Sequence, residues 1–99
     1  MLVVAGTFQI KPEKREEAVQ LLLQVVAETK KEAGCYVYDF FSELSDVNLF
    51  HVFEEWESME HLQAHFLTPH IKALGEAFPE MLASPANVKK YLVSSVEKL

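Results

Sequence analysis

The sequence contains one cysteine, three glycines and nine basic residues among its 99 positions. The lone thiol, Cys35, excludes an internal disulfide and a cysteine-based zinc site, and a single free cysteine is typical of a reducing cytoplasm. Fifteen acidic residues leave a net charge of −6, which argues against nucleic-acid and membrane partners, because both attract clustered lysine and arginine. The apolar stretch at residues 1–10 follows no basic region and is too short to cross a bilayer. We therefore expect a cytoplasmic protein.

What the sequence does have is apolar residues, which make up 49% of the chain. That fraction suffices for one domain over residues 1–99, and the length leaves no room for a second core. A domain of this size buries only about two-thirds of the surface that its unfolded chain exposes. We therefore expect help from a partner subunit.

Hydrophobic periodicity and capping residues divide the chain into strands and helices. Alternating apolar residues predict strands, and a turn at residues 45–48 joins two of them into a hairpin. Gly34 suits a helix end, whereas Ser58 and Thr68 suit helix N-caps. Pro79 is expected to bend or shorten the last helix. The predicted elements are strand 2–10, helix 12–33, strands 35–44 and 49–56, helices 59–66 and 69–82, and strand 88–96.

This order predicts an α+β fold, a ferredoxin-like β-α-β-β-α-α-β arrangement with an antiparallel sheet and helices on one side. The strands are apolar on both faces, and the helices can cover only one face. An exposed apolar surface of that size indicates an interface, and a two-fold homodimer through the sheet face is the commonest solution.

Several residues near the predicted element boundaries form a characteristic order. They are Gly34-Cys35 and Tyr38, then Glu54, Trp56 and Ser58, then His65 followed by Thr68-Pro69-His70. With this order and spacing the chain resembles the antibiotic biosynthesis monooxygenase family, including its small quinol-monooxygenase-like members, over nearly its whole length. The resemblance implies a dimeric α/β barrel, in which two sheets pack face to face and each subunit has a pocket between sheet and helices. It also implies oxygenase chemistry without a metal, flavin or other cofactor, in which a hydroquinone, anthrone or similar enolisable substrate supplies electrons to dioxygen.

Three residues are candidates for catalysis. His65 is the first candidate for the base, because an imidazole with a pKa near ~6.5 can be neutral at cytosolic pH and this one lies beside the apolar side of its helix. The alternative for His65 is a hydrogen bond from the helix edge to a backbone carbonyl. Glu54 shares a strand face with Trp56, where it can orient His65 or pair with a lysine or arginine. Tyr38 can donate a hydrogen bond to a developing oxyanion, or it can simply pack in the sheet.

Four further residues are assigned to a substrate pocket: Trp56 as its wall, Phe66 beside the base, His70 at its mouth, and Tyr36 on the strand face that it is predicted to share with Tyr38. For Trp56 a place in the core is the simpler alternative. For Tyr36 the simpler alternative is packing in the sheet or at a dimer interface.

No metal or haem is expected. His61 and His65 have the four-residue spacing of metal-binding pairs on helices, but no supporting signature accompanies them. The haem-degrading relatives of this fold have an asparagine, a tryptophan and a haem-ligating histidine at places where this chain has Thr7, His65 and Gly75. None of the three matches, which argues against haem degradation.

These features favour a cofactor-independent monooxygenase that oxidises a quinol or similar enolisable small molecule with dioxygen. Two other interpretations stay open. One is an isomerase of a small dione or sugar-derived compound that uses the same base, and the other is a non-catalytic dimeric module that binds a small molecule. The fold alone does not choose between them.

Overall fold

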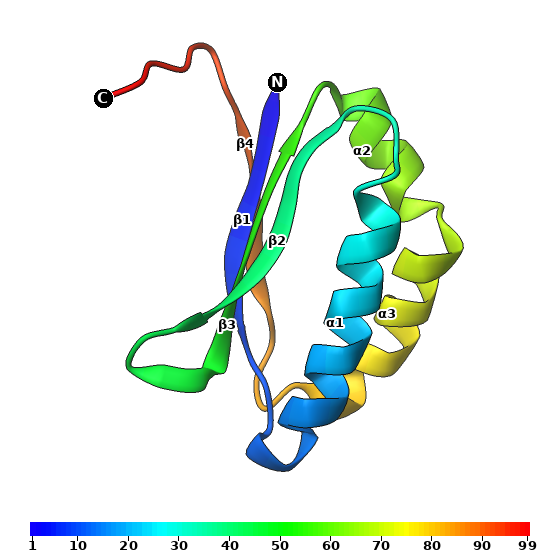
Figure 1. Ribbon diagram of the computed structural model, residues 1–99, viewed down its shortest axis with the longest axis vertical. Coiled ribbons are helices and arrows are strands. Elements are labelled where there is room, and N and C mark those ends of the chain that lie inside the picture. Colours follow the sequence, from blue (N-terminus) through cyan, green and yellow to red (C-terminus); the bar gives the residue numbers. More distant parts are fainter.

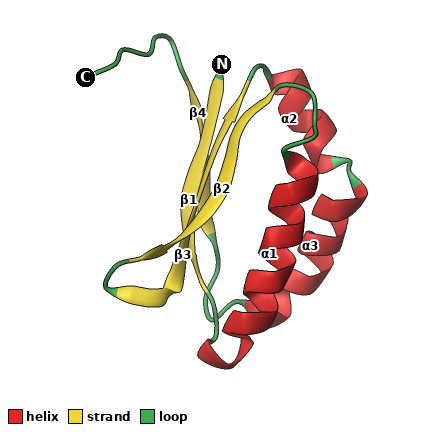
Figure 2. Ribbon diagram, in the orientation of Figure 1, coloured by secondary structure: helices red, strands yellow, loops and turns green.

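Four antiparallel strands form one sheet, and the helices cover only one of its faces (Figure 1, Figure 2). The computed structural model describes residues 1–99. The strands are β1 (Leu2–Gln9), β2 (Cys35–Glu43), β3 (Asp46–Trp56) and β4 (Asn87–Leu92). A short 3-10 turn, η1 (Pro12–Lys14), precedes the helices α1 (Arg15–Thr29), α2 (Met59–Phe66) and α3 (Pro69–Met81). None of these helices is both long enough and apolar enough to cross a membrane.

The strand order β2-β3-β1-β4 places β1 and β3 at the centre of the sheet. This is the predicted ferredoxin-like arrangement, with the pair α2 and α3 where the second helix of the simplest version would lie. Val4 of β1 lies opposite Glu54 of β3, and Tyr38 of β2 lies opposite the same glutamate from the other side. The helix-covered face therefore carries a row of Tyr38, Glu54 and Val4, with a carboxyl group in the middle.

The core lies between this sheet face and the helices. The buried residues of α1 recur at three- to four-residue spacing and so form one stripe along the helix: Ala18, Leu22, Val25 and Thr29. Two clusters of buried side chains pack against this stripe. One, around Phe8 and Phe50, joins the start of α1 to the end of α3, and the other, around Trp56, joins the end of α1 to α2.

Helix α1 ends at Thr29, four residues before the predicted end. Residues 30–34 form turns and a bend instead, and Gly34 has a φ of 77°, a conformation that favours glycine. A side chain at Gly34 would also collide, because its Cβ would lie 2.3 Å from the His61 ring. The early helix end takes Glu32 out of α1 and into the turn that faces α2.

Two strand boundaries also differ from the prediction. β3 begins at Asp46, because the hairpin turn is shorter than expected, and the Asp46 carboxylate accepts a hydrogen bond from the backbone N–H of the second residue after it. β4 ends at Leu92 and not at residue 96, because Leu92 pairs with Leu2, where β1 itself begins. Helix α3 continues through Pro79 to Met81, close to its predicted end.

The sheet face away from the helices is uncovered in the single chain (Figure 1). It exposes four large apolar side chains, which alternate along their strands with residues that face the helices. They are Val37, Phe41, Phe53 and Tyr91. The prediction that the sheet has two apolar faces and helices on only one of them is therefore confirmed.

Candidate active site

A cavity of about 160 Å³ lies between the sheet and the helices α2 and α3. Its wall is largely apolar and aromatic, and the polar groups in it belong to Glu54, His65 and Tyr38. Phe66 also lines the cavity, so four of the seven residues predicted from the sequence meet at one place. The three residues predicted to be catalytic are among them.

Two of the remaining predicted residues, Trp56 and His70, lie next to the cavity but not in its wall. Trp56 is completely buried, and its ring centroid lies 4.7 Å from that of His65. It therefore takes the core position and supports the imidazole from behind. His70 lies in the first turn of α3, where its ring faces Glu32 and borders a surface groove between α1 and α3.

The assignment of Tyr36 to the pocket is wrong. Tyr36 is 56% exposed, and its hydroxyl donates to the Glu57 carboxylate at 3.1 Å. The cause is an irregularity in the pairing of β2 with β3 between Cys35 and Val37. Such a shift places one extra residue in a strand and breaks the alternation of its faces, so Tyr36 does not share the face of Tyr38.

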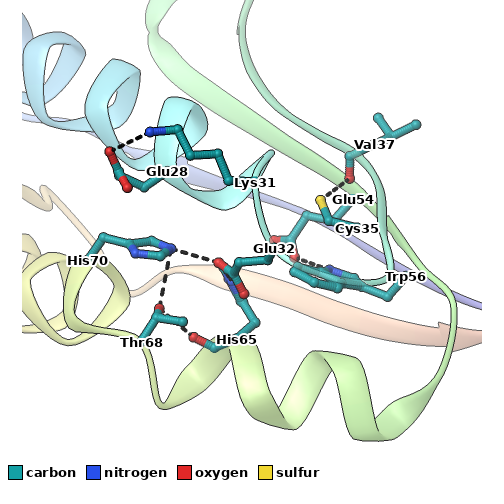
Figure 3. Close-up of polar contacts among 10 residues, drawn as sticks. All are labelled: Glu28, Lys31, Glu32, Cys35, Val37, Glu54, Trp56, His65, Thr68 and His70. Atoms are coloured by element: carbon teal, nitrogen blue, oxygen red, sulfur yellow. Dashed lines mark hydrogen bonds and ion pairs between the residues drawn. The ribbon is translucent and has the colours of Figure 1, made fainter.

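His65 is held in one orientation by its surroundings. The Ser58 hydroxyl caps α2 by accepting the His61 backbone N–H, as predicted, and His65 follows in the last turn of this helix. Its side chain is nearly inaccessible, and its Nδ1 lies 2.9 Å from Oε2 of Glu32 (Figure 3). Burial lowers the pKa of His65, and the hydrogen bond to Glu32 opposes that decrease. The imidazole is therefore kept in the neutral, proton-accepting form at neutral pH.

Glu32 is the residue that the sequence analysis missed. Its Oε2 accepts hydrogen bonds from two rings, at 2.9 Å from His65 Nδ1 and at 2.7 Å from His70 Nε2 (Figure 3). Nothing in the local sequence indicates this role, because Glu32 lies near the end of the helix predicted over residues 12–33 and belongs to no motif. Only the early end of α1 and the packing of the turn against α2 and α3 bring the three residues together.

Glu54 does not orient His65, as one of the sequence interpretations had it, and it forms no ion pair with a lysine or arginine. Its Oε1 accepts the indole N–H of Trp56 at 2.8 Å, because the two side chains share one face of β3. Glu54 is 7% exposed. Burial raises its pKa to about 7, the indole N–H opposes that rise, and the nearby charge of Glu32 adds to it. At neutral pH this carboxyl group can therefore both give and take a proton.

Tyr38 lies on β2 opposite Glu54, with its ring 5.3 Å from that of His65. Burial raises the pKa of its phenol well above the ordinary value, and the charge of Glu54 raises it further. The phenol therefore stays protonated and can act as a hydrogen-bond donor to a bound molecule. Tyr38 lines the cavity, and the donor role predicted for it stays a prediction.

The pair at His61 and His65 does not converge. His61 Nδ1 lies 2.7 Å from the Ser58 hydroxyl at the start of α2, whereas His65 turns toward Glu32. A different set is formed by Glu32, His65 and His70. The atoms that these residues could offer to a metal ion lie within 4.8 Å of one another. These three residues come from a turn and from two helices, so no local spacing could have identified them.

Taken together, the geometry can transfer protons in a cavity of low polarity. Because His65 Nδ1 donates to Glu32, Nε2 is the ring nitrogen that keeps a lone pair, and a carboxylate partner of this kind fixes the tautomer and raises the basicity of the ring. The Tyr38 phenol can stabilise an anion, and Glu54 provides a second group that exchanges protons near neutral pH. The arrangement requires no metal to abstract a proton from a phenol or an enol.

Comparison with known proteins agrees with this geometry. The model of the family described as antibiotic biosynthesis monooxygenase matches residues 1–77. The chain is 35% identical over 98 residues to protein sll1783 of Synechocystis sp., which is uncharacterized, and the match covers 99% of this chain and 67% of that protein. It is 33% identical to the probable quinol monooxygenase YgiN of Escherichia coli, over 78% of this chain and 84% of YgiN.

A solved structure leads to the same family. The crystal structure of an antibiotic biosynthesis monooxygenase superimposes with a TM-score of 0.89, at 27% identity, over 96% of this chain and all of the other. The match to the family model includes β1 to α2 and most of α3, and so every residue that lines the cavity except Phe78, Ala86 and Val88. The chain belongs to the antibiotic biosynthesis monooxygenase family.

Proposed function

We propose that the protein is a cofactor-independent monooxygenase that oxidises a quinol or a similar enolisable small molecule with dioxygen. The observation that carries this proposal is His65 at the cavity wall, nearly inaccessible to solvent, with Nδ1 held by Glu32 at 2.9 Å and Nε2 left free to accept a proton. Family membership and the similarity to YgiN support the reaction class.

The proposed reaction starts with proton transfer. His65 Nε2 takes a proton from a substrate hydroxyl, Glu32 stabilises the imidazolium that forms, and the Tyr38 hydroxyl donates to the resulting anion. The electron-rich anion then reacts with dioxygen. One oxygen atom enters the product and the other leaves as water, and the electrons come from the substrate, so a quinol and dioxygen give a hydroxyquinone and water.

Glu54 has a role in the second half of this scheme. With a pKa raised to about 7 and a place in the cavity wall, it can donate a proton as the oxygen–oxygen bond breaks and water leaves. General acid catalysis of this kind typically contributes about 10²–10⁴-fold. The single cavity would then contain a base, an anion-stabilising donor and an acid on three different elements.

The uncovered sheet face supports a homodimer as the working form. Its four exposed apolar side chains would become buried if two sheets packed face to face, as in a dimeric α/β barrel. Phe53→Glu would place a charge at the centre of that face. The dimer predicts that the wild type elutes at twice the chain mass and that Phe53→Glu shifts to the monomer. The same elution volume for both proteins would contradict the dimer.

The single cysteine agrees with a cytoplasmic location.

The function is tested by following dioxygen uptake with a panel of hydroquinones and anthrones, in the wild type and in His65→Gln. We expect uptake above the autoxidation blank in the wild type, a decrease of about 10²-fold or more in the variant, and one atom of ¹⁸O from labelled dioxygen in the product. His61→Gln, which changes a histidine of α2 that contacts Ser58 and Glu57 and does not line the cavity, is the matched control. Full turnover by His65→Gln would contradict the assigned base.

A second candidate function is an isomerase acting on a small dione. The observation that favours it is the presence of two proton-exchanging groups, His65 and Glu54, in one cavity, since one can remove a proton and the other can return it to a neighbouring atom. Turnover that continues at an unchanged rate without dioxygen would support the isomerase. Strict dependence on dioxygen would exclude it.

A further inference from the structure

We propose that Glu32, His65 and His70 form a binding site for a divalent transition metal such as Zn²⁺. The three residues come from the turn after α1, from the last turn of α2 and from the first turn of α3. They offer one carboxylate oxygen and two imidazole nitrogens, which are preferred zinc ligands. Figure 3 shows the Glu32 carboxylate between the histidines.

The distances suit this assignment. Nδ1 of His65 and Nε2 of His70 lie 2.9 and 2.7 Å from the same oxygen of Glu32, and all three potential metal-ligand atoms lie within 4.8 Å of one another. In a tetrahedral site with zinc bonds of about 2.0–2.1 Å, neighbouring ligand atoms are about 3.3 Å apart. One ion could therefore replace the two hydrogen-bonding protons if each ring moved away from the carboxylate by roughly half an ångström and the two ring nitrogens, which lie within 4.8 Å of each other, approached to about 3.3 Å.

The surroundings of the cluster also favour a cation. No lysine or arginine forms an ion pair with Glu32, so the two imidazoles are its only partners. The Thr68 hydroxyl donates to the His65 carbonyl at 2.7 Å and lies 3.3 Å from His70 Nε2, which fixes the start of α3 beside the site. Such supporting contacts orient metal ligands.

A metal ion can also reach this cluster from solvent. The side chain of His65 is 3% exposed, whereas those of Glu32 and His70 are 14% and 18% exposed. His70 borders the groove between α1 and α3, which shares no lining residue with the cavity. A metal ion can thus enter from the groove and keep a water molecule as its fourth ligand, without passing through the cavity.

Metal binding would change the state of the proposed base, and this consequence rests on the proposed function. A metal on Nδ1 of His65 leaves the ring proton on Nε2, the nitrogen that would otherwise accept the substrate proton. Zinc would therefore inhibit turnover by fixing His65 in the wrong tautomer. The cluster would act as a catalytic support when empty of metal and as an inhibitory site when it binds an ion.

Binding is tested by titrating the metal-free full chain with Zn²⁺ by calorimetry, together with Glu32→Gln and His70→Gln. We expect one ion per chain in the wild type and a loss of affinity of at least about 100-fold in each variant, since even residues that only support metal ligands are worth about 10–100-fold. The control is His51→Gln, which removes a histidine–glutamate pair with a 3.1 Å contact but no third ligand. Circular dichroism verifies that each variant is folded.

The outcomes separate the metal site from the oxygenase. Absence of stoichiometric binding, or equal affinity in the wild type and His70→Gln, would overturn the site whatever the enzyme does. Stoichiometric binding that both substitutions weaken would establish it even if no quinol is turned over. Once a substrate is known, inhibition by Zn²⁺ that a chelator reverses would support the tautomer mechanism. Full activity of the zinc-loaded protein would refute that mechanism.

Discussion

Replacing Glu54 by glutamine isolates the cost of a carboxylate charge beside the cavity. Glu54 is buried on β3, and burial is the main reason that its pKa is raised from 4.5 to about 7. A glutamine keeps an oxygen that can accept the Trp56 indole N–H, and its shape is nearly the same. The substitution therefore removes the charge and little else.

The magnitude follows from the pKa. A rise from 4.5 to about 7 corresponds to a penalty on the order of 3 kcal/mol for the ionised form in the folded protein. Because the folded pKa is higher than the unfolded one, this group favours folding below about pH 4.5, and that contribution is lost as the pH rises through about 7. Glutamine does not titrate, so the stability of Glu54→Gln relative to the wild type should increase by roughly 2–3 kcal/mol between pH 5 and pH 8.

The assay is urea unfolding at several pH values between 5 and 8, at one protein concentration, followed by the fluorescence of Trp56 and by circular dichroism. Other titrating groups are common to both proteins, so the difference in unfolding free energy isolates Glu54. Glu55→Gln, on the opposite face of the same strand, serves as the control for losing one negative charge. A difference between Glu54→Gln and the wild type that stays constant from pH 5 to pH 8 would refute the argument.

Three further predictions test the construction of the site. Glu32→Gln should lower turnover of an accepted substrate by about 10²–10⁴-fold while far-ultraviolet dichroism is unchanged, because His65 loses the carboxylate that fixes its tautomer; unchanged steady-state rates would contradict this. Ser58→Ala removes the oxygen that accepts the His61 N–H and should lower the free energy of unfolding, measured in urea, by about 1 kcal/mol. Gly34→Ala should lower the melting temperature more than Ser58→Ala does, because alanine is strained at a φ of 77° and its Cβ would collide with the His61 ring; equal melting temperatures would count against the close packing of this turn.

Much of the fold could be predicted because local signals agreed with one another. The stripe in α1, the alternation in β1 and β3 and the Ser58 cap each depend on residues that are neighbours in sequence, and the structure keeps them all. Tyr36 shows where such reasoning fails. Strict alternation placed it beside Tyr38, but a single irregularity in the pairing of β2 turned it outward. Register shifts depend on how two strands fit together, and one strand alone does not encode them.

The two buried or half-buried glutamates explain why the chemistry was harder to predict than the fold. Glu54 was found from the sequence because it interrupts an apolar strand face, but the partner expected for it was wrong, since the nearest donor is the Trp56 indole two residues away. Glu32 was not found, because its partners lie 33 and 38 residues further along the chain and meet it only after α1 ends early. Strand alternation locates a carboxyl group that lines the cavity, whereas the group that orients the base depends on the packing of two helices against one turn. Tertiary contacts therefore determine which residue orients His65. Both Glu32→Gln and Glu54→Gln should lower turnover, but only Glu54→Gln should also change the pH dependence of stability, because only Glu54 has a pKa raised by burial to about 7.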